Sequence, residues 1–201
     1  MSMSVEQFLS LSDAEQLQTI KDLNDIGQEE IIIDVLTGVG IDNLSVPLLG
    51  ELGRAYNNND KPEEAIKVFK TIDTEHRDAV WHYRCAYSHG SIASTNHEAY
   101  TSENMQQMLA LVDNGVRLAT KEDRNDIKEY CFEVMDMCRL QMDFEKCEVD
   151  YPDLCLNYSK YIAEKKKKRE GVPRQRTITV EEILATDDMW TINEPAYWTI
   201  N

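Results

Sequence analysis

The chain has 201 residues, of which 42% are hydrophobic and 29% are charged, and its formal net charge is −16. This length allows one elongated domain with a core of its own. An acidic surface repels the phosphate backbone of nucleic acids, so general nucleic-acid binding is excluded and a basic protein or peptide partner is favoured. Glycine (8) and proline (5) are both scarce, which favours helices over sheets with their many turns.

The cysteines and the apolar segments indicate the compartment. Five cysteines, an odd number, are typical of reduced thiols in a cytoplasmic protein. Residues 1–11 lack the basic start and long apolar run of a secretory leader. No segment approaches the roughly 18 apolar residues of a membrane span, so we expect no membrane contact.

Helix signals dominate the first 170 residues. Ser4 with Gln7 and Ser12 with Glu15 are two capping boxes, in which side chain and backbone at a helix start bond reciprocally. Residues 28–36 could form a strand by composition, but their acidic start and the glycines that follow indicate a buried helix. Gly90 begins a predicted polar break over residues 90–96. Further helices are predicted over residues 46–56, from 62, and over 77–89, 102–120, 123–142 and 152–162.

The last 31 residues differ from the rest. Residues 171–176 are a predicted linker, and Thr179 with Glu182 is a third capping box that opens a short helix. The tail contains Trp-Thr-Ile-Asn twice, at 190–193 and 198–201, and we expect it to be extended. Large apolar side chains cost about 1.5–3 kcal/mol each when left in water. We therefore expect domains at 1–170 and 171–201, with the tail packed back on the first domain or contacting a partner or a second copy.

One helix pair carries a repeat motif. Leu49-x2-Leu52-Gly53-x2-Tyr56 is followed by a polar turn and then by Ala65-x3-Phe69. This pattern resembles the tetratricopeptide repeat, which has W-x2-L-G-x2-Y on its first helix and A-x3-F on its second. Leu49 replaces the tryptophan, and the second helix has no terminal proline. The resemblance covers residues 46–72 and extends more weakly to 89.

The second unit can be aligned in two ways. Cys85-Ala86-Tyr87 echoes Arg54-Ala55-Tyr56, with the two tyrosines 31 residues apart. In one register Arg84 occupies the position of the small residue. In the other register Ala86 occupies it, and His82 and His89 then face inward.

The resemblance implies an all-α, right-handed superhelical stack of antiparallel helix pairs with a groove that binds a protein or peptide. It places Arg54 and Asn57 in the groove, together with Arg84. It adds Trp81 and Ser88 in the first register, or Tyr83 and Tyr87 in the second. The predicted function is protein–protein interaction, and one version, by analogy, is a bacterial immunity or regulatory protein that masks a basic surface.

The alternative is a metal- or thiol-dependent enzyme on a helical scaffold. His82, Cys85 and His89 share one helix face and carry zinc-ligand chemistry. Three ligands along one helix span too far to close tightly on an ion, so we expect packed side chains, no metal and no cofactor. Phosphate loops, nucleophile elbows and an oriented histidine triad are also missing from the sequence, so we predict no enzyme.

Two further groups of residues have structural explanations. Cys131, Cys138, Cys147 and Cys155 match no zinc spacing, and we interpret them as small buried thiols. The basic run 165–169 is predicted to end a helix, where it complements the helix dipole. Its alternatives are a dock for the protein's own acidic surface or a nuclear-import signal.

Overall fold

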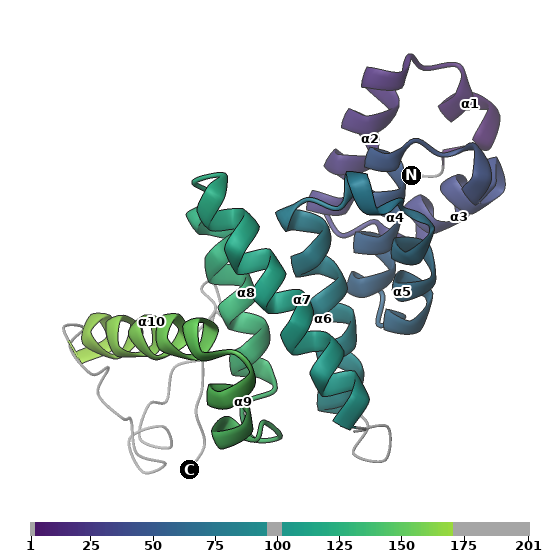
Figure 1. The fold of residues 1–201 in the computed structure, drawn as a ribbon. Helices are drawn as coiled ribbons and strands as arrows, with labels where there is room; N and C mark the ends of the chain where they lie inside the picture. Colours follow the sequence, from purple (N-terminus) through teal and green to yellow (C-terminus); the bar gives the residue numbers. More distant parts are fainter. Residues whose placement is uncertain (1–2, 96–101, 171–201) are drawn as a thin grey trace, which may run out of the picture. The chain divides into compact units, whose positions relative to one another are not determined.

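The computed structural model describes residues 3–95 and 102–170, and all regular secondary structure within them is helical (Figure 1). This confirms the all-α helical stack. None of these helices has both the length and the apolar composition needed to cross a bilayer. The α-helices are α1 (Val5–Leu9), α2 (Asp13–Asp25), α3 (Glu29–Val39), α4 (Val46–Asn58), α5 (Pro62–Thr71), α6 (Ala79–Thr95), α7 (Ser102–Lys121), α8 (Asn125–Met137), α9 (Phe144–Asp150) and α10 (Pro152–Glu170).

The chain divides into two compact units, Met1–Ala163 and Glu164–Asn201. Only the end of α10 is described in the second unit. The predicted linker, the third capping box and the Trp-Thr-Ile-Asn tail, with its expected contacts to the domain or a second copy, all lie outside the described residues.

Both N-terminal capping boxes form as predicted. The Gln7 N–H donates to Ser4 Oγ at 3.2 Å, and the Ser4 N–H donates to Gln7 Oε1 at 2.9 Å. At the start of α2 the Ser12 N–H donates to Glu15 Oε2 at 2.9 Å. The buried segment after α2 is the helix α3, as its acidic start indicates.

Two predicted boundaries are wrong. The polar break at residues 90–96 does not begin at Gly90, because α6 continues through it to Thr95. A Cβ on Gly90 would lie 3.2 Å from Val134 Cγ1 and 2.8 Å from Met137 Cε, so this glycine permits close packing of α6 on α8. The predicted helix 123–142 is shorter in the structure, because α8 ends at Met137 and a turn follows it. The next helix, α9, begins after Asp143, whose Oδ1 accepts the N–H of Lys146.

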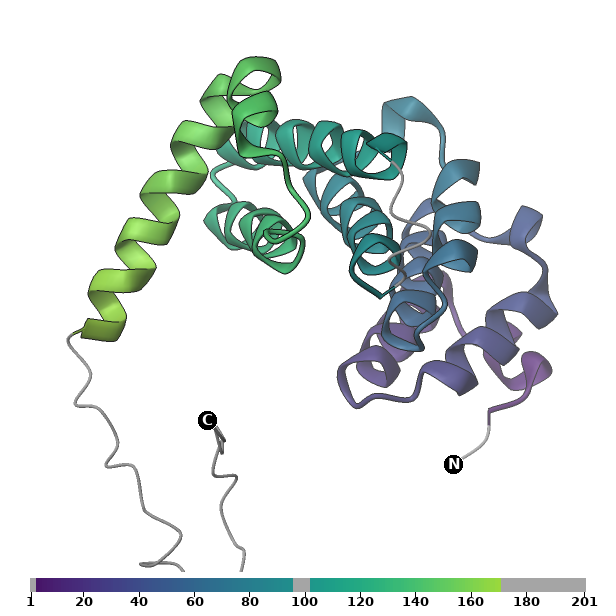
Figure 2. The same cartoon turned by 90° about the horizontal axis from the view of Figure 1, so that it is seen from below.

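Helices α2 to α8 pack side by side in chain order, and their contacts define two series (Figures 1 and 2). Helices α2, α4, α6 and α8 each contact the next member of this series. Helices α3, α5 and α7 each pack against the two members that flank them in the chain. Side chains of α2, α4, α6 and α8 can therefore line one continuous surface.

Two of the motif residues pack directly against each other between α4 and α5. Gly53 and Phe69 are both buried, and a Cβ on Gly53 would lie 2.9 Å from Phe69 Cδ1 and nearer still to two other ring carbons. Only a glycine leaves room for the ring here, so the pair fixes the distance between the two helices.

Candidate functional site

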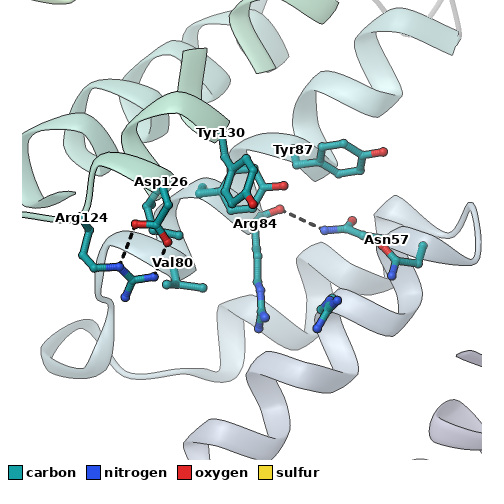
Figure 3. A pocket seen from close by; sticks show the side chains of 11 residues that line it. Asn57, Val80, Arg84, Tyr87, Arg124, Asp126 and Tyr130 are labelled. Carbon is teal, nitrogen blue, oxygen red and sulfur yellow. Dashed lines mark hydrogen bonds and ion pairs between the residues drawn. The ribbon is translucent and has the colours of Figure 1, made fainter. Parts of the chain in front are cut away.

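A hollow of about 540 Å³ opens where α4, α6 and α8 meet, and we call it the central hollow (Figure 3). Its side chains come from α4, α6 and α8 and from the turn before α8. They are Arg54, Asn57, Asn58, Val80, Tyr83, Arg84, Tyr87, Arg124, Asp126, Ile127 and Tyr130. The structure thus brings together five of the seven predicted groove residues: Arg54, Asn57, Tyr83, Arg84 and Tyr87.

Tyrosines form the aromatic part of the central hollow. Tyr83 of α6 and Tyr130 of α8 stack with ring centroids 5.3 Å apart and planes inclined by 29°. Tyr130 remains 43% exposed, and Tyr87 lies half-buried on the same wall. Burial raises the pKa of Tyr83, so its hydroxyl stays protonated at neutral pH. The three rings offer apolar surface together with hydroxyl groups.

Arg84 belongs to the floor of the hollow rather than to its open surface. Its Nη1 donates to the Gly50 carbonyl at 2.9 Å, and its Nη2 donates to Glu51 Oε1 at 3.0 Å. Glu51 is 6% exposed, and its other oxygen accepts the side-chain amide of Asn24 at 2.9 Å. A buried charge persists when it is paired and hydrogen-bonded. This network joins α2, α4 and α6.

The expectation that Ser88 and Asn57 face a partner needs correction. Ser88 is fully buried, and its hydroxyl donates to Asn57 Oδ1 at 2.7 Å. Asn57 is 8% exposed, and its Nδ2 donates to the Arg84 carbonyl at 3.0 Å. The side-chain groups of this Asn–Ser pair are therefore used in joining α4 to α6, because buried polar groups require partners.

Arg54 and Arg124 stand at the rim. Arg54 Nη2 donates to Asp25 Oδ1 at 2.9 Å, while Arg124 donates to both carboxylate oxygens of Asp126 at 2.9 and 2.8 Å. The hydrogen bonds from Arg124 lower the pKa of Asp126 to about 2. A guanidinium has five N–H donors, so both arginines keep donors for a bound group.

Trp81 faces a different hollow, of about 360 Å³, that borders α2, α4, α5 and α6. Its Nε1 donates to the Phe69 carbonyl at 3.1 Å, and the Arg77 guanidinium lies 4.5 Å from the ring centroid. Neither Trp81 nor Ser88 lines the central hollow, whereas Tyr83 and Tyr87 both do. Of the residues that the second register turns inward, Ala86 and His89 are buried and His82 is half-buried.

The metal or thiol site of the alternative hypothesis is not assembled. No trio of His, Cys, Asp and Glu side chains within residues 3–95 and 102–170 is arranged to hold a metal ion. Burial lowers the pKa values of His82 and His89. Burial also raises the pKa of Cys85 to about 11, so its thiol stays protonated and weakly nucleophilic at neutral pH.

Sequence reasoning missed the contribution of α8 to the hollow. Arg124, Asp126, Ile127 and Tyr130 line it, yet α8 carries no repeat motif. Helical spacing does place Ile127 and Tyr130 on one face. That pattern predicts a buried face without saying which helix the face meets.

Comparison with known proteins finds no family model, curated protein or solved structure that matches the chain. The geometry of the hollow is therefore the basis for a functional proposal.

Proposed function

We propose that the chain is a tetratricopeptide-like protein–protein interaction module that holds a segment of a partner protein in the central hollow. The observation that carries this proposal is the pair of stacked tyrosines, Tyr83 and Tyr130, in a hollow that Arg54 and Arg124 also line; Tyr130 remains 43% exposed. Tyrosine and arginine dominate the energetic centres of protein interfaces. An aromatic side left open to solvent in a concave site supports contact with another molecule.

The lining suggests the chemistry of the bound segment. Arg54, Arg124 and Asn58 supply hydrogen-bond donors, and the tyrosines supply flat apolar surface. A segment that presents backbone carbonyls or carboxylates, together with one aromatic or aliphatic side chain, fits this combination.

Charge acts on two scales. The chain as a whole is strongly acidic, which attracts a partner of positive net charge over long distances. Inside the hollow each arginine has an acidic neighbour, so short-range recognition depends on hydrogen bonds and aromatic contact. The proposed partner is accordingly basic overall, whereas the segment in the hollow need not be.

Binding is favoured over catalysis by the state of the groups in the hollow. Asp126, the carboxylate that lines it, is held as an anion by Arg124 with a pKa of about 2. A general base works best with a pKa near the operating pH, so Asp126 is poorly suited to proton transfer.

Free thiols at all five cysteines support the proposal of a reducing, cytoplasmic location.

Selection of peptides from a random display library tests the proposal. The full chain is the bait, and the affinity of each selected peptide is measured by fluorescence anisotropy. Tyr130→Ala removes the exposed ring, and Arg124→Glu reverses a rim charge that is 46% exposed in its side chain. Each change should weaken binding at least about tenfold, the equivalent of about 1.4 kcal/mol.

The control is Arg139→Glu, which makes the same charge reversal at an exposed position outside the hollow. It should leave affinity within about twofold. Peptides that bind the parent, Tyr130→Ala and Arg124→Glu equally would place the binding surface elsewhere and refute the proposal. A photo-cross-linking amino acid at position 130, compared with one at exposed position 140, then extends the test to native partners.

A further inference from the structure

Two cysteines at the junction of α9 and α10 lie almost within bonding distance. Cys147 Sγ and Cys155 Sγ are 2.7 Å apart, less than 1 Å beyond the about 2.05 Å of a disulfide bond. Both are free thiols, and they are 2% and 5% exposed. Their proximity goes beyond the small buried thiols that the sequence suggests.

The backbone between them already holds a closed turn. The Tyr151 N–H donates to the Cys147 carbonyl at 2.7 Å, and the Cys155 N–H donates to the Tyr151 carbonyl at 3.0 Å. These two hydrogen bonds connect the cysteines through a single residue. Because the sulfurs are already 2.7 Å apart, a bond between them requires a further approach of less than 1 Å.

A small hollow gives access to one of the thiols. Cys147 lines a space of about 180 Å³ together with Met105, Leu109, Lys146 and Tyr151. A water molecule takes up about 30 Å³ in the liquid, so a molecule of the size of hydrogen peroxide fits within this space. A bulky tripeptide disulfide such as oxidised glutathione does not fit.

We propose that Cys147 and Cys155 form an oxidation-sensitive dithiol that hydrogen peroxide closes to a disulfide. The Cys147 thiolate attacks one peroxide oxygen, the O–O bond breaks, and a sulfenic acid and one water form once protons are taken up. The Cys155 sulfur then attacks the sulfenic sulfur, the S–O bond breaks, and the second water leaves. Two thiols and one peroxide give one disulfide and two waters, so peroxide is the electron acceptor.

The environment makes this pair slow to react. Burial raises the pKa values of both thiols, which keeps the thiolate rare at neutral pH. Oxidation should therefore accelerate with rising pH and respond to sustained rather than brief peroxide exposure. The disulfide would tie α9 to α10, and the inference does not depend on partner binding in the central hollow.

Mass spectrometry of the full chain tests the dithiol directly. The native protein is treated with hydrogen peroxide at pH 8, unfolded, alkylated with iodoacetamide and digested with trypsin. Cleavage after Lys146 and Lys160 places both cysteines in one peptide, 147–160. In the oxidised sample this peptide should lack both alkyl groups and be two hydrogen atoms lighter than its reduced form. Cleavage after Glu148 should leave its two parts joined.

Matched variants assign the bond. Cys155→Ser should abolish the loss of two hydrogens and leave Cys147 as a sulfenic acid that dimedone traps. Cys138→Ser is the control, because its hydroxyl can keep the hydrogen bond that Cys138 makes to the Gly90 carbonyl, and it should oxidise like the parent. Full alkylation of Cys147 and Cys155 after peroxide treatment, or pairing of Cys147 with another cysteine, would overturn the proposal.

Discussion

The contact between Gly53 and Phe69 gives the sharpest test of the helix stack. Replacing Gly53 by alanine puts a methyl group within 2.9 Å of Phe69 Cδ1 and closer to two further ring atoms. Both residues are buried, so neither α4 nor the ring can move without disturbing the core. Overpacking of this kind costs about 1–3 kcal/mol.

Gly50 on the same helix is the matched control. A methyl group there would lie 3.5 Å from Arg84 Nη1, an ordinary van der Waals distance. Alanine gains about 0.5–1 kcal/mol over glycine in a helix interior at either position. The difference between Gly53→Ala and Gly50→Ala cancels this gain and isolates the steric cost. We expect Gly50→Ala to be neutral or stabilising and Gly53→Ala to be about 1–3 kcal/mol less stable than it.

Urea denaturation followed by far-ultraviolet circular dichroism measures this difference in the free energy of unfolding. In thermal unfolding the Tm of the two variants should differ by several degrees, at about 2–4 °C per kcal/mol. A double-mutant cycle with Phe69→Leu adds a second readout. Leucine lacks the ring atoms nearest Gly53, so Gly53→Ala should cost less in that background. Equal stability of Gly53→Ala and Gly50→Ala, or an unchanged cost of Gly53→Ala in the Phe69→Leu background, would refute the packing described for α4 and α5.

Two further predictions concern buried polar groups. Arg84→Met leaves the Glu51 carboxylate without its main partner and should lower the free energy of unfolding by about 3 kcal/mol. Adding Glu51→Gln should restore part of this loss, and an additive double variant would contradict the pairing. Burial lowers the pKa values of His82 and His89, so the unfolded chain binds more protons below its own histidine pKa of about 6.5, and stability should fall from pH 7.5 to 5.5. His89→Gln should flatten this slope in urea titrations at the two pH values, whereas an unchanged slope would mean that His89 is not responsible.

The α4–α5 pair was predictable because its signals are local and its packing is within one helix pair. The spacing from Leu49 to Phe69 specifies two helices and their contact, and the structure has both. Gly90 shows the limit of such reasoning. Taken alone it indicates the end of a helix, yet the side chains that require a glycine there belong to α8, more than forty residues away. A distant contact of this kind leaves no local signature.

The central hollow was predictable only in part for a related reason. Arg54, Tyr83 and Tyr87 follow from the repeat pattern, whereas Tyr130 comes from a helix without that pattern. The register of α6 was undecided in the sequence, because both alignments put residues suited to binding on the groove face. In the structure Arg84 donates to the Gly50 carbonyl and to Glu51, whereas Tyr83 and Tyr87 line the hollow.

The buried polar groups under the hollow connect folding to the proposed function. Glu51, Arg84, Asn57 and Ser88 have the residue types expected in a binding groove, but their hydrogen bonds join α2, α4 and α6 to one another. Buried hydrogen bonds of this kind specify one arrangement of helices more strictly than apolar packing does. These hydrogen bonds fix the distance between α4 and α6, and this distance sets the width of the central hollow. If the proposed function is correct, this fixed spacing holds Tyr83 in position before a partner binds, and such preorganisation reduces the ordering cost of binding. The buried polar residues would then act by positioning the tyrosines and the rim arginines, which would make the contacts to the partner.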